Sequence, residues 1–191
     1  MDPNTGVIKR NGIEYQLENL LCDAPVTGTI YGVLLNYKGT FSDQGPEINE
    51  AQYKEPPKAP ILYIKPANTI IGYGMPVPLP KDVHELEVGA ALDVVFGSSA
   101  TRVSEEQALE YVAGYTIVND ISIPHKSVYR PAINQKARDG FCSFGPWVIG
   151  RDALTNPDTV GVRVFVNGEL RTNNSLHSIP EPHISSRYII N

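Results

Sequence analysis

The sequence predicts a mixed α/β protein that is rich in β-strands and has few, short helices, and three observations support this class. Pro and Gly, which interrupt helices, each number 16 among the 191 residues. Val, Ile and Tyr, which favour strands, fill the short apolar runs between them. Asn-Gly pairs at 11–12 and 167–168 each separate strand-like segments, and this dipeptide predicts a tight hairpin turn.

Short apolar runs bounded by turn residues give the expected strands. In chain order these are residues 6–10, Thr29–Leu35, Ile61–Ile64, Asn68–Ile71, Glu85–Gly97, Tyr115–Asn119, Trp147–Ile149 and Gly161–Val166. The segment between the first hairpin turn and residue 21 fits either a second strand or a short helix. Residues 36–60 predict mostly loop, with a possible helical turn over Ala51–Lys54, and residues 126–140 predict a loop with at most one helical turn.

A helix is expected over Glu105–Gly114. Ser104 and Gln107 have the spacing of a capping box at its start, and Gly114 is where it would stop. Its apolar side would be formed by Ala108, Tyr111 and Val112.

The composition favours a folded protein in an ordinary aqueous compartment. Apolar residues make up 41% and charged residues 19%, which is typical of a packed core. A net charge of −5 argues against nucleic-acid binding, which favours basic domains. No run approaches the roughly 18 apolar residues of a membrane span, and the first residues lack the pattern of a signal peptide. We therefore expect a cytoplasmic protein with no nucleic-acid or membrane partner.

The two cysteines, Cys22 and Cys142, are isolated in the sequence, so they do not predict a disulfide framework. Cys142 has no obvious base beside it and is expected to be a small core residue.

The candidate functional site lies in the stretch from Gly114 to Gly150. Asp120 follows the apolar run GYTIVN, where a carboxylate could ligate a metal or could cap the following turn. Lys136 and Arg138 come shortly afterwards, and together with Asp139 they could bind a substrate carboxylate or form a solvated loop. Lys65 follows an apolar strand, so its ammonium could lie at a pocket rim or extend to solvent.

Two further acids precede this stretch on one expected strand. Glu85 and Glu87 are two residues apart, so their side chains would lie on the same face and could hold Mg²⁺ or Mn²⁺. They could equally be solvent-facing charges that protect an edge strand. Asp93 has the same parity inside an apolar run, and we expect it to be paired or exposed because an unpaired buried acid is costly.

Five motifs carry a resemblance to the fumarylacetoacetate hydrolase family, and they occur in the family's order between about Tyr31 and Arg171. They are YGVLLNYKG, PILYIKPANTIIGYGMPVPLP, LDVVFGSSATRVSEEQALEYVAGYTIVNDIS, KARDGFCSFGPWV and VFVNGELR. The resemblance implies the family's β-roll of mixed sheets. It is greatest to the N-terminal repeat of the enzymes of homoprotocatechuate (4-hydroxyphenylacetate) degradation. These decarboxylate 5-carboxymethyl-2-oxo-hex-3-ene-1,7-dioate and isomerise 2-hydroxyhepta-2,4-diene-1,7-dioate.

The resemblance implies a divalent metal, Mg²⁺ or Mn²⁺, held by a Glu-x-Glu pair and a later Asp. Asp120 matches that Asp, and Lys136 matches a family lysine near the metal and substrate. Lys136 and Arg138, with Lys65 as a weaker candidate, would hold substrate carboxylates or stabilise developing charge. An ungapped alignment puts Gly89 and Ala91 at the places of the two glutamates, so the metal site is expected to be degenerate or absent. Glu85 and Glu87 would lie about 13 Å further along the strand.

The resemblance also predicts a chain that is short at its C-terminus. The family continues beyond VNGEL with a helix and a PGD…TGTP segment, whereas this chain continues into LHSIPEPHISSRYIIN. The expected organisation is a hairpin extension at 1–28, an incomplete catalytic-type domain at 29–175 and an irregular tail at 176–191. The expected substrate is a small dicarboxylate 2-oxo or 2-hydroxy acid. The expected assembly is a homo-oligomer, or a hetero-oligomer with a complete family subunit in which this chain could be a non-catalytic scaffold.

Overall fold

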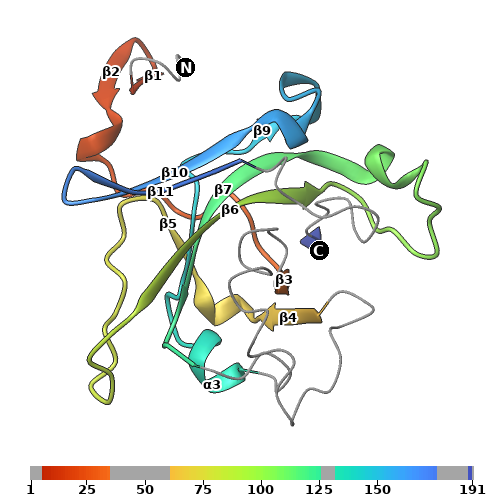
Figure 1. Cartoon of the computed structure of the whole chain (residues 1–191). Coiled ribbons are helices and arrows are strands. Elements are labelled where there is room, and N and C mark those ends of the chain that lie inside the picture. The colour runs from red at the N-terminus through yellow and green to blue at the C-terminus, as the bar shows by residue number, and fades with distance from the viewer. Residues whose placement is uncertain (1–5, 35–60, 126–131, 176–188, 191) are drawn as a thin grey trace, which may run out of the picture.

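The computed structural model describes residues 6–34, 61–125, 132–175 and 189–190, and strands dominate them (Figure 1). The strands are β1 (Val7–Arg10), β2 (Ile13–Gln16), β3 (Ile30–Leu34), β4 (Ile61–Lys65), β5 (Ile70–Gly72), β6 (Glu87–Phe96), β7 (Val112–Ser122), β8 (Cys142–Phe144), β9 (Ile149–Gly150), β10 (Gly161–Val166), β11 (Glu169–Ser175) and β12 (Ile189–Ile190). This β-rich arrangement with short helices confirms the predicted fold class.

Eight of these strands form one mixed sheet in the order β4-β3-β12-β6-β7-β8-β5, with β9 pairing β7. The parallel pairs are β12 with β6 and β5 with β8, and the remaining pairs are antiparallel. The two longest strands, β6 and β7, cross the centre of the molecule side by side (Figure 1). The hairpins β1–β2 and β10–β11 are separate two-stranded sheets.

The large sheet is rolled, so that its edge strand β4 meets the inner face of the central strand β7. The buried Lys65 at the end of β4 donates hydrogen bonds to the carbonyl oxygens of Ile121 (2.7 Å) and Phe141 (2.6 Å). Gly32 on β3 makes room for this closure, because a Cβ there would overlap the Tyr63 ring on the neighbouring β4. The roll therefore has an inner face, on which the candidate site lies, and an outer face.

Each face of the β6–β7 pair has its own apolar cluster. Inside the roll, Val118 on β7 packs with buried residues from the other strands and the N-terminal segment, namely Val26, Ile30, Cys142 and Phe144. Outside, Leu92 and Val94 on β6 pack with Val112 and Tyr115 on β7. Cys142 is buried as predicted, with 1% of its surface exposed.

Both Asn-Gly turns are confirmed. Each pair has positive φ at both residues, 53° and 78° at Asn11-Gly12 and 53° and 82° at Asn167-Gly168. This is the backbone of a tight two-residue hairpin turn, which Asn and Gly adopt more readily than other residues. The alternative of a second strand after the first turn is also correct, because β2 begins at Ile13 and is followed by a short 3₁₀ turn, η1 (Leu17–Asn19).

The helix expected over Glu105–Gly114 is wrong. Only the 3₁₀ turn η3 (Ala108–Tyr111) forms there, and β7 already begins at Val112. Val112 pairs with Phe96 and Tyr115 pairs with Val94, so strand pairing overrides the local helix signal. Ser104 Oγ lies 3.4 Å from Gln107 Oε1, and the backbone N–H of Gln107 donates to the Ser104 carbonyl, which closes a turn rather than a helix.

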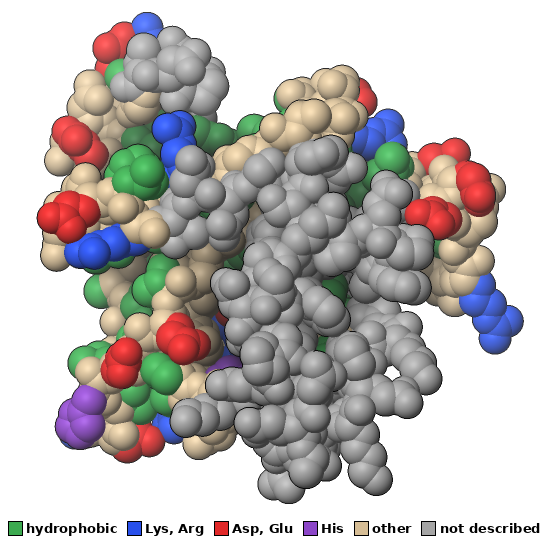
Figure 2. Space-filling model, viewed as in Figure 1, with side chains coloured by type: hydrophobic (Ala, Val, Ile, Leu, Met, Phe, Trp, Pro, Cys, Tyr) green, Lys and Arg blue, Asp and Glu red, His purple; other side chains and the backbone are tan. Residues whose placement is uncertain are grey.

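The remaining helices are single turns, as predicted. They are η2 (Ala67–Thr69), α3 (Ile133–Lys136), η4 (Arg151–Ala153) and η5 (Pro157–Thr159). The described residues include no helix long and apolar enough to cross a membrane. On the face seen in Figure 2, acidic and basic side chains are interspersed at the edges of the described surface.

Several expectations fall outside the described residues, including the helical turn over Ala51–Lys54, the first part of the 126–140 loop and most of the tail at 176–191. The proposed domain boundaries and the shortened C-terminus remain predictions.

Candidate functional site

Asp120 is the centre of a polar cluster on the inner face of the roll. It lies within β7 rather than at its end, and its backbone is paired with Gly89 on β6 and Cys142 on β8. Its carboxylate contacts three side chains, from Tyr63, Lys65 and Lys136. These contacts come from other elements, so the alternative that Asp120 caps the following turn is wrong.

Lys65 is the most deeply buried member of this cluster, with 0% of its surface exposed. Its ammonium forms an ion pair with Asp120 Oδ1 and donates to the carbonyls of Ile121 and Phe141. All three N–H donors therefore have a partner, which a buried lysine requires. The expectation that Lys65 lies at a pocket rim or extends to solvent is wrong, because β4 places this side chain inside the roll.

Lys136 reaches the same carboxylate from the single helical turn α3, which contacts both β4 and β7. Its ammonium lies 3.6 Å from Asp120 Oδ2, and 4.6 Å from the centroid of the Tyr63 ring. The side chain is 9% exposed, so it is nearly enclosed by these partners. A cation over an aromatic face and beside a carboxylate is stabilised by both groups.

Tyr63 was not anticipated from the sequence, although it is two residues before Lys65 and therefore on the same face of β4. Its hydroxyl donates to Asp120 Oδ2 at 2.5 Å. Burial raises the pKa of this phenol well above its usual value, and the negative charge of Asp120 raises it further. Tyr63 is therefore a hydrogen-bond donor at all ordinary pH values.

Arg138 does not join Lys136. Its Nη2 bonds Asp82 Oδ2 at 3.0 Å and its Nε bonds the Asn134 carbonyl at 2.8 Å, both at the surface. A hydrogen bond within its own turn and the Arg138 guanidinium lower the pKa of Asp82. The nearby Asp139 accepts a hydrogen bond from Asn68 instead, at 2.6 Å. Of the three charged residues grouped in the sequence, the structure brings only Lys136 to Asp120.

The strand β6 presents no carboxylate directly opposite Asp120. Gly89 is the backbone partner of Asp120 and Ala91 is the partner of Val118, so these two positions face the cluster. Glu87 is two pairs further along, opposite Ser122, and its carboxylate lies 3.4 Å from the Ser122 hydroxyl. Glu85 precedes the strand, and both glutamates are exposed.

Asp93 is buried on the same face, 3% exposed, and its Oδ2 has no hydrogen-bond partner. This differs from the expectation that it would be paired or exposed. Burial raises its pKa to about 8, with a further contribution from the negative charge of Asp120, so the carboxyl is largely protonated at neutral pH. A protonated acid avoids most of the cost of burying a charge, which explains how the residue is tolerated.

Cys142 lies close to the same group of charges, but it is inert. Burial raises the pKa of its thiol far above the ordinary value, so no reactive thiolate forms.

The described residues do not fit a divalent metal. Among them, no group of three His, Cys, Asp or Glu side chains is placed to share an ion. The one carboxylate at the centre, Asp120, already faces two ammonium groups, which repel a divalent cation. A metal of this class needs several oxygen ligands, and Gly89 and Ala91 provide no side-chain oxygen on the facing strand.

Comparison with known proteins identifies the class to which this rolled sheet belongs. The chain is similar to the 4-hydroxyphenylacetate degradation bifunctional isomerase/decarboxylase of Escherichia coli. The two are 43% identical over 141 residues, which cover 74% of this chain and 32% of that protein. It is also similar to the solved structure of 5-carboxymethyl-2-hydroxymuconate delta-isomerase from Mycobacterium smegmatis. That match has a TM-score of 0.68, 26% identity and covers 88% of this chain and 64% of the other.

A third similarity concerns the fold alone. The solved structure of maleylpyruvate hydrolase from Sphingobium sp. SYK-6, in complex with manganese(II) ion and pyruvate, matches with a TM-score of 0.66 at 23% identity. That match covers 87% of this chain and 56% of that chain.

The chain belongs to the family described as Fumarylacetoacetate (FAA) hydrolase C-terminal, which matches residues 29–180. The family predicted from the five sequence motifs is therefore confirmed. The chain spans about a third of the length of three curated relatives that it matches, between 32% and 35%.

Proposed function

We propose that this chain is a metal-free module of the fumarylacetoacetate hydrolase family, which works beside a metal-bearing module in the catabolism of aromatic compounds. The neighbouring module would carry out the decarboxylation or isomerisation of a dicarboxylate 2-oxo or 2-hydroxy acid. This chain would serve as its structural partner. The observation that carries the proposal is the pairing of Asp120 with Gly89, which leaves no side-chain metal ligand opposite Asp120 on the facing strand.

The contacts of Asp120 support this role. In a metal site the Asp120 carboxylate would be available to coordinate the ion. Here both of its oxygens contact other side chains, which belong to Lys65, Lys136 and Tyr63. Ion pairs of this kind hold β4, β7 and α3 together. The similarity to isomerase/decarboxylases of aromatic catabolism supports the substrate class, and the larger size of those relatives leaves room for a second module.

Titration with Mn²⁺, followed by calorimetry and by water-proton relaxation, tests the absence of a metal site. We expect no saturable binding below about 1 mM for the natural chain, because one carboxylate beside two ammonium groups has too few ligands. Micromolar binding that disappears in Asp120→Ala would overturn the proposal and would favour metal-assisted enolate chemistry by this chain itself. Glu85→Gln and Glu87→Gln show whether either exposed glutamate contributes to such binding.

A variant designed to bind a metal gives a complementary test of the missing ligands. Glutamates introduced by Gly89→Glu with Ala91→Glu would face Asp120 and Val118 from β6, and we expect them to create Mn²⁺ binding. The matched control is Gly89→Gln with Ala91→Gln, which has similar side-chain size without the charges. A Cβ at Gly89 would lie 3.1 Å from the Asp120 carbonyl oxygen, so a small backbone adjustment is needed in both variants.

The partnership is tested by co-expression with a complete family enzyme from the same genome. Size-exclusion chromatography with light scattering should show a mixed oligomer, and the decarboxylase or isomerase activity should belong to the complete enzyme. Decarboxylase or isomerase activity of the purified chain alone, on 5-carboxymethyl-2-oxo-hex-3-ene-1,7-dioate or 2-hydroxyhepta-2,4-diene-1,7-dioate, would contradict the assigned role.

A further inference from the structure

The outer face of the β6–β7 pair carries a pocket that is separate from the Asp120 cluster. Its volume is about 480 Å³, which lies within the range of small-molecule sites. Side chains alternate between the two faces along each strand, so Val94 and Tyr115 face outward while their neighbours Asp93 and Thr116 face into the roll. A ligand in the pocket would therefore be separated from Asp120 by the sheet itself.

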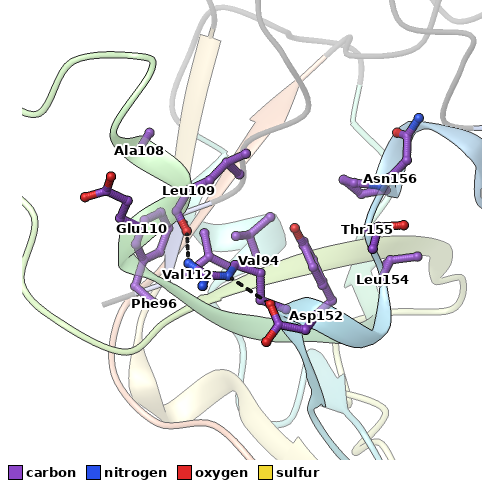
Figure 3. A pocket seen from close by; sticks show the side chains of 13 residues that line it. Val94, Phe96, Ala108, Leu109, Glu110, Val112, Asp152, Leu154, Thr155 and Asn156 are labelled. Carbon is purple, nitrogen blue, oxygen red and sulfur yellow. Dashed lines mark hydrogen bonds and ion pairs between the residues drawn. The ribbon is translucent and has the colours of Figure 1, made fainter.

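Four parts of the chain form the pocket. Val94 and Phe96 on β6 and Val112 and Tyr115 on β7 form the floor. The 3₁₀ turn η3 contributes Leu109 on one side, and the segment that follows η4 contributes Leu154, Thr155 and Asn156 on the other (Figure 3). The lining is thus mainly apolar and includes two aromatic rings, which suits a planar apolar ligand.

Arg151 links the two sides of the pocket and brings a guanidinium group to its lining. Its Nη1 donates to the Leu109 carbonyl at 2.9 Å, and its Nε lies 3.6 Å from Asp152 Oδ1. Neither of these two contacts uses its Nη2. Because Arg151 lines the pocket, this nitrogen is positioned for an oxygen atom of a bound molecule.

The charges around the pocket argue against an anionic ligand. The single positive charge of Arg151 is outnumbered by the two acids that also line the pocket, Glu110 and Asp152. Figure 3 shows the Glu110 carboxylate directed outward from the apolar space, and the Asp152 side chain is 96% exposed. An incoming carboxylate would be repelled by both, whereas an uncharged molecule would not.

We propose that this pocket binds a small, uncharged aromatic molecule that carries one oxygen able to accept a hydrogen bond. The aromatic ring lies against the apolar floor of β6 and β7, and the oxygen atom accepts from Nη2 of Arg151. This site differs in face, polarity and ligand charge from the inner cluster around Asp120. It is independent of the role proposed for the whole chain.

The probe for this site is 2-naphthol at pH 7, followed by saturation-transfer NMR and by amide shifts in ¹⁵N-labelled protein. We expect saturable binding with shifts centred on Leu109 and Leu154. Ala108→Trp fills the pocket from η3 and should weaken binding at least about tenfold. Ile117→Trp is the matched control, because Ile117 is 54% exposed on the same face of β7 but does not line the pocket. If Ala108→Trp fails to fold, Leu109→Trp replaces it.

The charge argument is tested with 2-naphthoate, which has the same rings and a negative charge. It should bind at least about fivefold more weakly than 2-naphthol. The double variant Glu110→Gln with Asp152→Asn should narrow this difference by strengthening naphthoate binding alone.

Three results would overturn the proposal. They are no saturation by 2-naphthol up to its solubility limit, equal losses in Ala108→Trp and Ile117→Trp, and naphthoate binding as tight as naphthol. A natural chain that dimerises, with a dimer that dissociates in Ala108→Trp, would also overturn the proposal. The pocket would then be the binding site for a second copy of the chain.

Discussion

Lys136 and Arg138 are two residues apart in the sequence, yet they lie in opposite environments. Lys136 is enclosed between the Tyr63 ring and the Asp120 carboxylate, and it belongs to the buried cluster inside the roll. Arg138 pairs with Asp82 at the surface, where the Arg138 side chain is 28% exposed and that of Asp82 is 64% exposed. The difference arises because α3 ends at Lys136, so Arg138 lies beyond the turn and is not directed to Asp120 with it.

The comparison indicates how differently the two ion pairs should contribute to stability. A surface pair gains little, because water and salt screen it. Removing one partner of a buried ion pair leaves the other charge without compensation, and this lowers the free energy of unfolding by several kcal/mol. The same inner face also carries the buried acid Asp93, whose raised pKa keeps it largely protonated at neutral pH and so reduces the cost of burying a charge. The predictions below test this contrast in order of decreasing effect.

Replacing Lys65 should have the largest effect. Lys65→Met removes the ion pair with Asp120 and one hydrogen-bond donor from each of the Ile121 and Phe141 carbonyls. We expect the free energy of unfolding to fall by about 3–5 kcal/mol, measured by urea denaturation. Lys81→Met, at an exposed lysine, is the control and should change little. A similar small change in both variants would show that the inner cluster is no stronger than the surface.

The second prediction concerns Asp93 and pH. Its pKa is about 8 in the folded protein and near the ordinary value of about 4 when unfolded, so only the folded state keeps the proton between these values. The contribution of this proton to the free energy of unfolding is greatest below about pH 4 and is lost as the pH rises towards 8. Asp93→Asn should remove this dependence and be more stable than the natural chain at pH 9 by at least about 2 kcal/mol.

Denaturant titrations of both proteins at pH 5, 7 and 9 make this measurement. Asp93→Asn should match the natural chain most closely at the lowest pH, where both side chains are neutral. A natural chain whose stability does not fall between pH 5 and 9 relative to the variant would contradict the raised pKa.

The third prediction ranks the two remaining partners of Asp120. Lys136→Met should lower the free energy of unfolding by about 1–3 kcal/mol, because it removes a nearly buried cation from both a carboxylate and an aromatic ring. Tyr63→Phe removes one hydrogen bond while the ring stays, and it should cost about 1 kcal/mol. The reverse order would mean that the phenol, rather than the ammonium, is the main support of the carboxylate.

The smallest effect is expected at the surface. Arg138→Met removes the pair with Asp82, and we expect thermal unfolding to be unchanged within error at physiological salt. A loss as large as that in Lys136→Met would remove the distinction between the two environments.

The turns and the central strands could be predicted from local sequence, because their signals are local. Asn11-Gly12 and Asn167-Gly168 need only the preference of these residues for positive φ. The long strand ending at Phe96 has a clear apolar run. The helix expected over Glu105–Gly114 could not be judged in this way, since the partner of Val112 is Phe96, which is on another strand.

The candidate site was only partly predictable for the same reason. Asp120 and Lys136 were identified from spacing and family resemblance, and Tyr63 could have been found by applying the two-residue period of a strand to Lys65. The separation of Lys136 from Arg138 depends on where α3 ends and on how it packs against β4 and β7, which the sequence does not encode locally. Asp93 was placed on the correct face, but its protonation depends on burial that only the closed roll provides.

The contact between Lys65 and Asp120 also has a consequence for the order of folding. It joins an edge strand to a central strand 55 positions later in the chain, so it forms only when the sheet has curled. Because the entropy of closing so long a loop must be lost before the contact can contribute, we expect this contact to form after the local hairpins. We therefore expect Lys65 to lower the unfolding rate of the rolled sheet, with little effect on the rate at which the hairpins form.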